Sequence, residues 1–437
     1  MTVTDTQHAA TIAAPVPPVG QERRSKVALS PVHDAIVHET ETIRVDWRKG
    51  ETITALVPAW RSLAARTGQP NIFHDPDFLL PAVTTLGLLP NLETVAAWER
   101  APRVEGRPRL LGIFPFLRHR PWGLPITVAQ CVTHAYGPAG TPPIDSENAR
   151  DVMRALVDAF ASSHKLPQVV SVPFLSLSSD VATALVGAPY RQAHFGGYLR
   201  AMLSTELDGE AYLNAARKPK QRKRMAQQAR QLAKLGTVET RSVTGSAVAA
   251  AAERFLTIER KGWKGRRGTA MASDDKTATM FRDLTGRLGH RDQCVIYELT
   301  LDDQVIASFV LLIAGSHGWL WKGAFDEDYA RQSPGQLLTE DLVRQVLTRH
   351  PGLVIDSCAL PGHPMIEHIF RERIAYADLL LDVREDGHGL AFPTAVFLET
   401  LRRSGRHYAR QLLKPWRELR ARGMGGLKRA FGKAPRV

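Results

Sequence analysis

Cysteine is scarce in this sequence, with three residues in a chain of 437. Cys131, Cys294 and Cys358 lie far apart and form no CxxC pair, so the sequence predicts neither a disulfide framework nor a cysteine-rich metal site. Residues 363–368 superficially resemble an HxxEH zinc motif, but the spacing has one extra residue and a proline interrupts it, so we expect no metal. Few cysteines suit a reducing cytoplasm.

Long apolar runs are also missing. No stretch approaches the roughly 20 apolar residues that a membrane-spanning helix needs. Residues 1–20 have neither the basic start nor the continuous apolar run of a secretory signal. We therefore expect a cytoplasmic protein that is neither secreted nor inserted across a membrane.

The composition and length are those of a globular protein with two domains. The chain is 44% hydrophobic and 23% charged, and it exceeds the roughly 100 to 200 residues of a usual domain. Residues 1–40, rich in Ala, Thr, Pro and Val, predict a disordered leader. We expect an N-terminal domain at 41–203, a C-terminal domain at 204–388 and a basic helical tail at 389–437.

Helical and strand patterns alternate along both halves, which predicts an α/β or α+β fold. Residues 301–304 form a plausible hairpin turn, so the strands around it should pair antiparallel. The predicted helices are 56–66, 149–162, 217–235, 246–262, 275–289 and one that follows residue 335. The predicted strands are 92–98, 110–117, 168–172, 197–203, 294–301, 305–314, 318–324 and 353–357.

Acidic residues are almost absent from two basic segments, which dominate the net charge of +13. The first, 217–234, predicts a helix with either a solvated basic face or a phosphate-binding one; it has no aromatic residue on which a base could stack. In the second, 402–436, Glu418 is the one acid. Apolar residues precede and interleave the basic ones, as in an amphipathic helix that packs on the core or lies on an anionic membrane. These apolar residues are Val396, Phe397, Leu401, Tyr408, Leu412, Leu413 and Trp416.

The segment 321–338 joins a predicted strand to a predicted helix. Ser333 can cap this helix, and Pro334 and Gly335 stand where it should begin. The first turn of a helix exposes unpaired N–H groups, which bind phosphate oxygens well. The sequence therefore predicts a phosphate seat at the start of this helix.

This segment resembles the donor-binding signature of the GNAT superfamily, which reads Gln or Arg, two residues, Gly, one residue, then Gly or Ala. Gln332, Gly335 and Leu337 occupy those places, with Ser333, Pro334 and Gln336 between them. The resemblance implies a donor of the acetyl-coenzyme A type, or another acyl-coenzyme A. Leu337 departs from the pattern, because a bulky residue replaces the small one that lets pyrophosphate approach the backbone.

A longer resemblance covers roughly residues 200–385. The segments 262–265, 268–270, 321–322 and 333–338 are similar to those of the CelD/BcsL-like acetyltransferases linked to cellulose biosynthesis, which are relatives of the Fem aminoacyltransferases. The resemblance implies tandem GNAT-like domains, each a mixed, mostly antiparallel sheet flanked by helices, with one active site in the C-terminal copy. It also implies that the donor's pantetheine lies between two parted strands.

Acyl transfer to an amine needs a group that removes a proton and a donor for the carbonyl oxygen as charge develops. Asp356 ends the strand where the resemblance puts the acceptor site, so it is a candidate base or amine anchor; otherwise it begins a turn. Lys322 is a second candidate, with an ion pair to Asp326 or Asp356 as the structural alternative. His363 is either a proton relay or a turn histidine.

We assign the acceptor site to Trp263, Lys264, Trp321 and Asp326. The alternative for the first two is structural: a buried indole and a cation that interacts with the C-terminus of a helix. The sequence does not identify the acceptor, and a saccharide or small molecule from polysaccharide metabolism is what the resemblance suggests.

Three functions follow from these features. The first is an enzyme that transfers an acetyl or other acyl group from coenzyme A to an amine or hydroxyl. The second is a Fem-like transferase that uses aminoacylated transfer RNA. The third is a GNAT fold without catalysis that binds polyanions or a membrane surface, which a blocking role for Leu337 would favour.

Overall fold

The computed structural model describes residues 35–101, 108–363, 365–384, 389–406 and 408. Most of the predicted leader and the last part of the predicted tail therefore lie outside the described residues. Ala35–Glu39 form strand β1, which begins within the range predicted as leader. None of the helices in the described ranges has the length and apolar character needed to cross a membrane.

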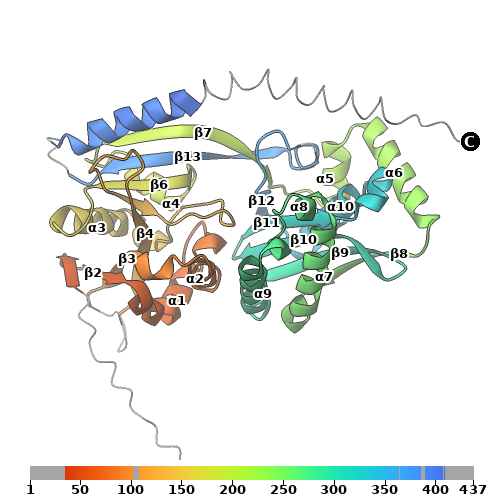
Figure 1. Cartoon of the computed structure of the whole chain (residues 1–437), viewed down its shortest axis with the longest axis horizontal. Coiled ribbons are helices and arrows are strands. Elements are labelled where there is room, and N and C mark those ends of the chain that lie inside the picture. The colour runs from red at the N-terminus through yellow and green to blue at the C-terminus, as the bar shows by residue number, and fades with distance from the viewer. Residues whose placement is uncertain (1–34, 102–107, 364, 385–388, 407, 409–437) are drawn as a thin grey trace, which may run out of the picture. The chain divides into compact units, whose positions relative to one another are not determined.

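The described strands form one sheet of 13 strands in the order β1-β2-β3-β4-β5-β6-β13-β7-β12-β11-β10-β9-β8 (Figure 1). The strands are β1 (Ala35–Glu39), β2 (Ile43–Lys49), β3 (Glu93–Glu99), β4 (Leu110–His119), β5 (Val128–Cys131), β6 (Val169–Ser176), β7 (Gln192–Leu203), β8 (Val238–Val243), β9 (Cys294–Leu301), β10 (Gln304–Ala314), β11 (His317–Phe325), β12 (Val354–Asp356) and β13 (Glu372–Asp382). The helices are α1 (Val57–Ala64), α2 (Pro76–Thr85), α3 (Ala149–Ser162), α4 (Asp180–Leu185), α5 (Gly209–Ala216), α6 (Pro219–Ala233), α7 (Val248–Lys261), α8 (Trp263–Arg266), α9 (Asp275–Gly289) and α10 (Pro334–Arg349). The predicted class, a mixed and mostly antiparallel sheet flanked by helices, is confirmed.

The two halves of the sheet follow the same plan. In each, a series of antiparallel strands ends in one parallel pair, β5 with β6 and β11 with β12. A helix connects the members of each parallel pair, α3 in the first half and α10 in the second. A parallel step needs such a crossover connection, because the second strand must start from the same edge as the first.

Strand β13 interlocks the halves. Although β13 is the last of the described strands in sequence, it pairs with β6 on one side and with β7 on the other. Strand β7 in turn pairs with β12 of the second half. The sheet is therefore continuous across the junction, and neither half completes its strand order from a single stretch of sequence.

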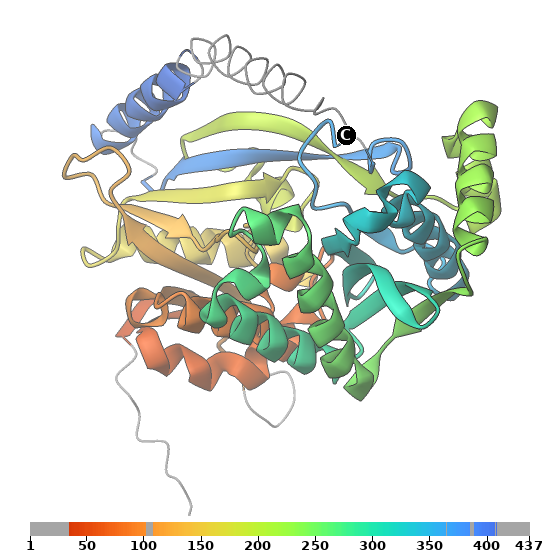
Figure 2. The same cartoon turned by 45° about the vertical axis from the view of Figure 1, so that its right-hand side comes forward.

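Helices cover both faces of the second half. α7 and α9 lie on one face of the sheet and α10 on the other (Figure 2). The first face carries Trp319 and Trp321, and the second carries Leu320. The hydrophobic core between α7, α9 and the sheet also includes Phe73 and Phe78 of the N-terminal half. The rings of Phe78 and Trp321 pack edge to face, with 5.3 Å between their centroids. Helix α6 buries only three of its residues and stands at the edge of the fold (Figure 1).

A buried ion pair lies at the junction. Arg200 of β7 donates from Nη1 to Oδ2 of Asp356 at 2.9 Å, and the two residues are 3% and 5% exposed. The guanidinium also donates to the carbonyl of Pro138 and to the hydroxyl of Tyr198. Its central carbon lies 4.3 Å from the centroid of Tyr376. Both charges are thus removed from water and matched to each other.

We expect Arg200→Met to reduce the free energy of unfolding by about 3 to 5 kcal/mol, because it leaves the buried Asp356 carboxylate without its cation. Urea unfolding measures this loss. Arg287→Met is the control, since Arg287 pairs with Asp283 on the surface of α9, and it should cost less than about 0.5 kcal/mol. Equal losses in the two variants would contradict the structural role of the junction pair.

Candidate functional site

A cleft opens where β11 and β12 part. The two strands pair only from His317 to Trp319 of β11, and beyond that point β11 has an edge without a strand partner among the described residues. The cleft has a volume of about 610 Å³. Its walls are the end of β11, the residues 357–360 after β12, the start of α10, and α8.

The start of α10 forms one end of the cleft, with Ser333, Pro334, Gly335 and Gln336 in its lining. Ser333 has a left-handed backbone with φ of 51°, and its side chain makes no capping hydrogen bond. Instead its Oγ accepts from Nε2 of Gln228 in α6 at 3.0 Å. The predicted cap is therefore absent, and α6 holds the helix start in place.

The side chain of Leu337 lies away from this cleft. It lines a separate cavity under α6 together with Met225 and Leu232, and it packs against the core on the α10 side. The bulky residue therefore does not obstruct the helix start. Gln332, half-buried in a short turn before α10, does not line the cleft.

A β-bulge re-aims the end of β11. The register with β10 shifts so that Val310 faces Lys322 while Leu311 faces Leu320, which leaves Trp321 as the extra residue. The Trp321 indole donates to the carbonyl of Tyr136 at 2.7 Å and stacks on Phe281. The indole is thus fixed in the core.

Lys322 follows the bulge and lines the cleft, and no acidic side chain in the described ranges pairs with it. Its Nζ lies 4.9 Å from the ring centroid of Tyr136 and 5.6 Å from that of Trp321. Burial lowers the pKa of Lys322 to about 8. The structural alternative for Lys322, an ion pair with Asp326 or Asp356, does not form, because Asp326 pairs with Lys261 at 2.7 Å and Asp356 pairs with Arg200.

Lys264 fastens α8 to the mouth of the cleft. Its Nζ donates to the buried carboxylate of Glu259 at 2.8 Å and to the carbonyl of Gly323 at 3.0 Å. The other oxygen of Glu259 accepts from the amide of Met271. Trp263 lines the same mouth and is 46% exposed, so the interpretation as a buried indole is wrong.

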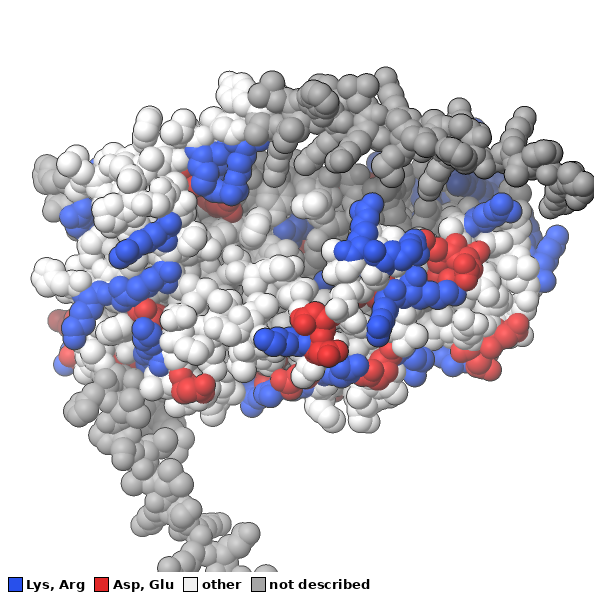
Figure 3. Space-filling view, viewed as in Figure 1, with Lys and Arg blue, Asp and Glu red and all other residues white. Residues whose placement is uncertain are grey.

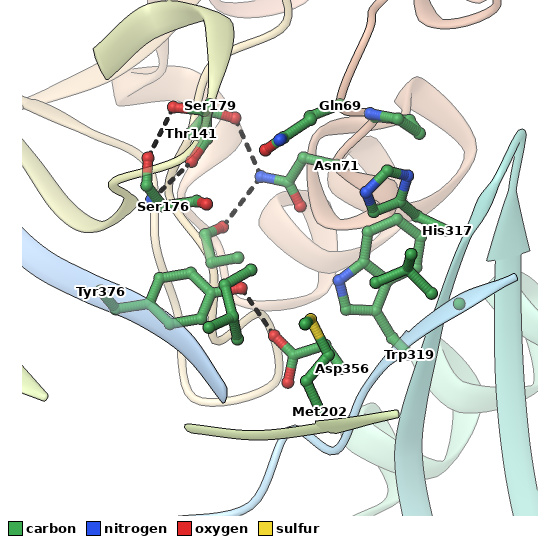
Figure 4. A pocket seen from close by; sticks show the side chains of 15 residues that line it. Gln69, Asn71, Thr141, Ser176, Ser179, Met202, His317, Trp319, Asp356 and Tyr376 are labelled. Atoms are coloured by element: carbon green, nitrogen blue, oxygen red, sulfur yellow. Dashed lines mark hydrogen bonds between the residues drawn. The ribbon is translucent and has the colours of Figure 1, made fainter. Parts of the chain in front are cut away.

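Asp356 lies behind the cleft, and each oxygen of its carboxylate accepts at least one hydrogen bond. Besides Arg200, the Tyr376 hydroxyl donates to Oδ2 at 2.6 Å (Figure 4). The amide of Cys358 donates to Oδ1 at 2.7 Å, which closes a turn in which Cys358 has a φ of 52°. The carboxylate faces a small cavity of about 30 Å³ between the halves, beside Trp319 (Figure 4). Asp356 thus shapes the cleft wall at Cys358.

His363 lines the cleft near the start of α10 and is exposed. Its Nδ1 accepts weakly from the amide of Ile366 at 3.4 Å, and partial burial lowers its pKa. Asp326 lies outside the lining and holds Lys261. The predicted residues that the structure brings together at the cleft are Trp263, Lys264, Trp321, Lys322, Ser333, Pro334, Gly335, Gln336 and His363.

Residues of the N-terminal half also reach this site, which the sequence patterns did not indicate. Tyr136 packs against Lys322, and burial together with the nearby Lys322 charge lowers the pKa of His134 to about 4. Both belong to the segment after β5. In the first half, β5 and β6 part in the same way, and this segment fills the space between them. There the amide of Gly140 donates to the carbonyl of Phe174, and Thr141 Oγ1 accepts from the amide of Ser176.

Comparisons with known proteins agree with this architecture. The sequence model of a family described as an acetyltransferase (GNAT) domain matches residues 219–355. The fold is similar to the crystal structure of FemX, with a TM-score of 0.50 and 9% identity over 76% of this chain and 96% of that one. A conserved protein of unknown function from Bacteroides thetaiotaomicron has a TM-score of 0.46 and 9% identity over 75% of this chain and 97% of that one. No curated protein sequence matches the chain.

The matched residues contain the cleft strand β11 and the helix start of α10. The chain thus has a GNAT-like fold, and residues 219–355 in its second half match the sequence model of an acetyltransferase (GNAT) domain.

Proposed function

We propose that this protein transfers an acyl group, in the simplest case acetyl, from a thioester of the coenzyme A type to an amine or hydroxyl. The observation that supports it is the cleft itself. At one end is a helix start suited to phosphate. Among the residues that the structure describes, the strand edge along one side has no partner strand, and the lysine beside the bulge has no counter-ion.

The donor fits this cleft in an extended conformation. Its amides pair with the free edge of β11 beyond Trp319, as an added strand would. Its phosphates lie at the start of α10, where Pro334 has no N–H and the amides of Gln336 and Leu337 donate to the carbonyl of Ser333, so within the described residues the Gly335 amide is the first-turn donor left for a phosphate oxygen. A Cβ at Gly335 would lie 3.4 Å from Sδ of Met365, in contact with the cleft lining. Since Leu337 points elsewhere, it does not oppose this binding.

Lys322 then acts on the reacting carbonyl. The acceptor's lone pair attacks the thioester carbon, a C–N or C–O bond forms, the C–S bond breaks, and the thiolate leaves. The acceptor's proton passes through water to the leaving sulfur. An ammonium that lacks a carboxylate in the ground state gains one negative neighbour, the oxyanion, only as the transition state forms.

The other residues have supporting roles. Asp356 positions the wall at Cys358, and Lys264 positions α8. Trp263, exposed at the mouth, offers an apolar surface for the acceptor, and His363 remains a proposed proton relay. The resemblance to CelD/BcsL-like acetyltransferases supports an acceptor from polysaccharide metabolism.

A further part of this proposal is that the protein binds peripherally to a membrane through its tail. Residues 391–406 form a helix that packs Phe392 and Ala395 on the sheet. Phe397 and Leu401 on the same helix are exposed at 65% and 59%. A basic helix with exposed apolar residues can contact an anionic membrane.

Acetyl-coenzyme A should raise the melting temperature of the wild-type protein, because a ligand that binds the folded state stabilises it. Gly335→Trp should remove this shift by filling the helix start. Gly286→Trp is the control, since a Cβ at Gly286 of α9 meets nothing within 4 Å, and it should keep the shift. No shift in the folded wild type at millimolar ligand would contradict donor binding.

Lys322→Met should lower kcat by a factor of about 100 to 1000, the usual loss when an oxyanion donor is removed. It should also raise the free energy of unfolding near pH 7 by on the order of 1 to 3 kcal/mol, because the folded state holds the ammonium at a cost. The folded pKa of about 8 lies below the unfolded value, so this gain is full below pH 8 and shrinks as the pH rises towards the unfolded value.

Unfolding in urea at pH 7 and pH 10 measures the stability difference, and turnover measures the activity. Lys322→Arg is the matched variant, since it keeps the charge at alkaline pH and should lack the decline in rate that we expect of the wild type above pH 8. Unchanged turnover in Lys322→Met would rule out the proposed role.

A further inference from the structure

We propose that the donor is presented by a small acidic carrier protein that docks on helix α6 and extends its phosphopantetheine thioester into the cleft. This inference rests on the proposed function and names the partner that supplies the donor. Three observations support it: the charges of α6, the position of α6 relative to the cleft, and the apolar lining between α6 and Lys322.

Helix α6 carries a set of exposed cations that have no acidic partner. These are Lys218, Lys220, Arg222, Lys223, Arg224, Arg230 and Lys234. Within the described part of the chain, none of them forms a salt bridge, and the segment 217–235 contains no acid. Elsewhere arginines are paired closely, as Arg254 is with Glu298 and Arg118 with Glu93. The charge on α6 is therefore available to a partner.

The cations form a stripe on the outer face of the helix. At 100° per residue, Lys223, Arg230 and Lys234 fall opposite the face that buries Met225, Gln228 and Leu232, and Lys220 falls on the flank between the two faces. The helix has 15 residues, so the stripe runs for about 22 Å. Figure 3 shows basic side chains at the edge of the molecule that α6 forms in Figure 1. A single phosphate group of a nucleotide is too small to contact a stripe of this length.

The inner face of α6 contacts the proposed phosphate seat. Gln228 donates to Oγ of Ser333 and to the carbonyl of Arg331, and Ser333 lines the cleft. Between this end and Lys322, the lining is largely apolar, including Phe309, Phe325 and Met365. The helix that carries the stripe on its outer face thus contacts the cleft at the opposite end from the reacting carbonyl.

This separation decides between macromolecular donors. In an aminoacylated RNA the acyl group is esterified to the terminal ribose, so the phosphate backbone would approach the Lys322 end. In a carrier protein a long uncharged arm separates the thioester from one phosphate, which is attached directly to the acidic protein surface. The carrier protein matches the arrangement in this chain. Lys322 is followed along the cleft by apolar lining, then by the phosphate seat, and then by the helix that carries the cationic stripe. A lipid surface is disfavoured because the outward face of α6 has no large apolar residue to insert.

The test compares two acetyl donors by affinity, acetyl-coenzyme A and a bacterial acyl carrier protein loaded with acetyl-phosphopantetheine. We expect the wild type to bind the loaded carrier protein more tightly than acetyl-coenzyme A. Lys223→Gln, Arg230→Gln and Lys234→Gln combined should weaken binding of the carrier protein at least tenfold while changing that of acetyl-coenzyme A less than twofold. Raising KCl from 50 to 300 mM should likewise weaken the carrier protein selectively.

The matched control combines Lys49→Gln, Lys165→Gln and Lys276→Gln, which removes the same charge from exposed sites on other elements. It should bind both donors as the wild type does. Equal effects of the two triple variants, or binding of acetyl-coenzyme A without the carrier protein, would overturn the inference but leave the proposed function intact. Binding of neither donor would overturn both. Stripe-dependent binding of RNA in place of the carrier protein would overturn the inference in favour of the aminoacyl route.

Discussion

The ion pair between Arg200 and Asp356 is the contact on which the site depends. It joins β7 to β12, and through the Asp356 carboxylate it also fixes the turn at Cys358. The turn directs the chain away from β11, and the cleft opens at that point. One buried carboxylate thereby serves both the union of the halves and the shape of the donor cleft.

Lys322 shows the opposite treatment of a buried charge. Most buried charges in this fold are matched, as Glu259 is by Lys264 and Glu298 by Arg254. Lys322 has two aromatic rings for neighbours and no carboxylate within salt-bridge distance in the described residues. Such an unmatched cation costs stability in the resting protein, and the cost is relieved when negative charge develops beside it.

Local patterns in the sequence were sufficient to predict most of the secondary structure of the second half. The apolar runs of β9, β10 and β11 and the helix that begins at Pro334 are confirmed, because each depends on neighbouring residues. Strand β13 was missed, since its partners β6 and β7 are distant in sequence. Two features of the site depend on tertiary structure in the same way. Tyr136 reaches Lys322 only through the packing of the halves, and the direction of Leu337 depends on how α10 is rotated.

The place of β13 has a consequence for how the protein is made. During synthesis β6 and β7 leave the ribosome long before β13, whose last residue is Asp382. Until then their facing edges have no strand between them, and an open edge invites pairing with other chains. The nascent N-terminal half therefore depends on the end of the second half to close its sheet, so that folding of the two halves is coupled late in translation and the interval before it is the period of greatest risk of aggregation.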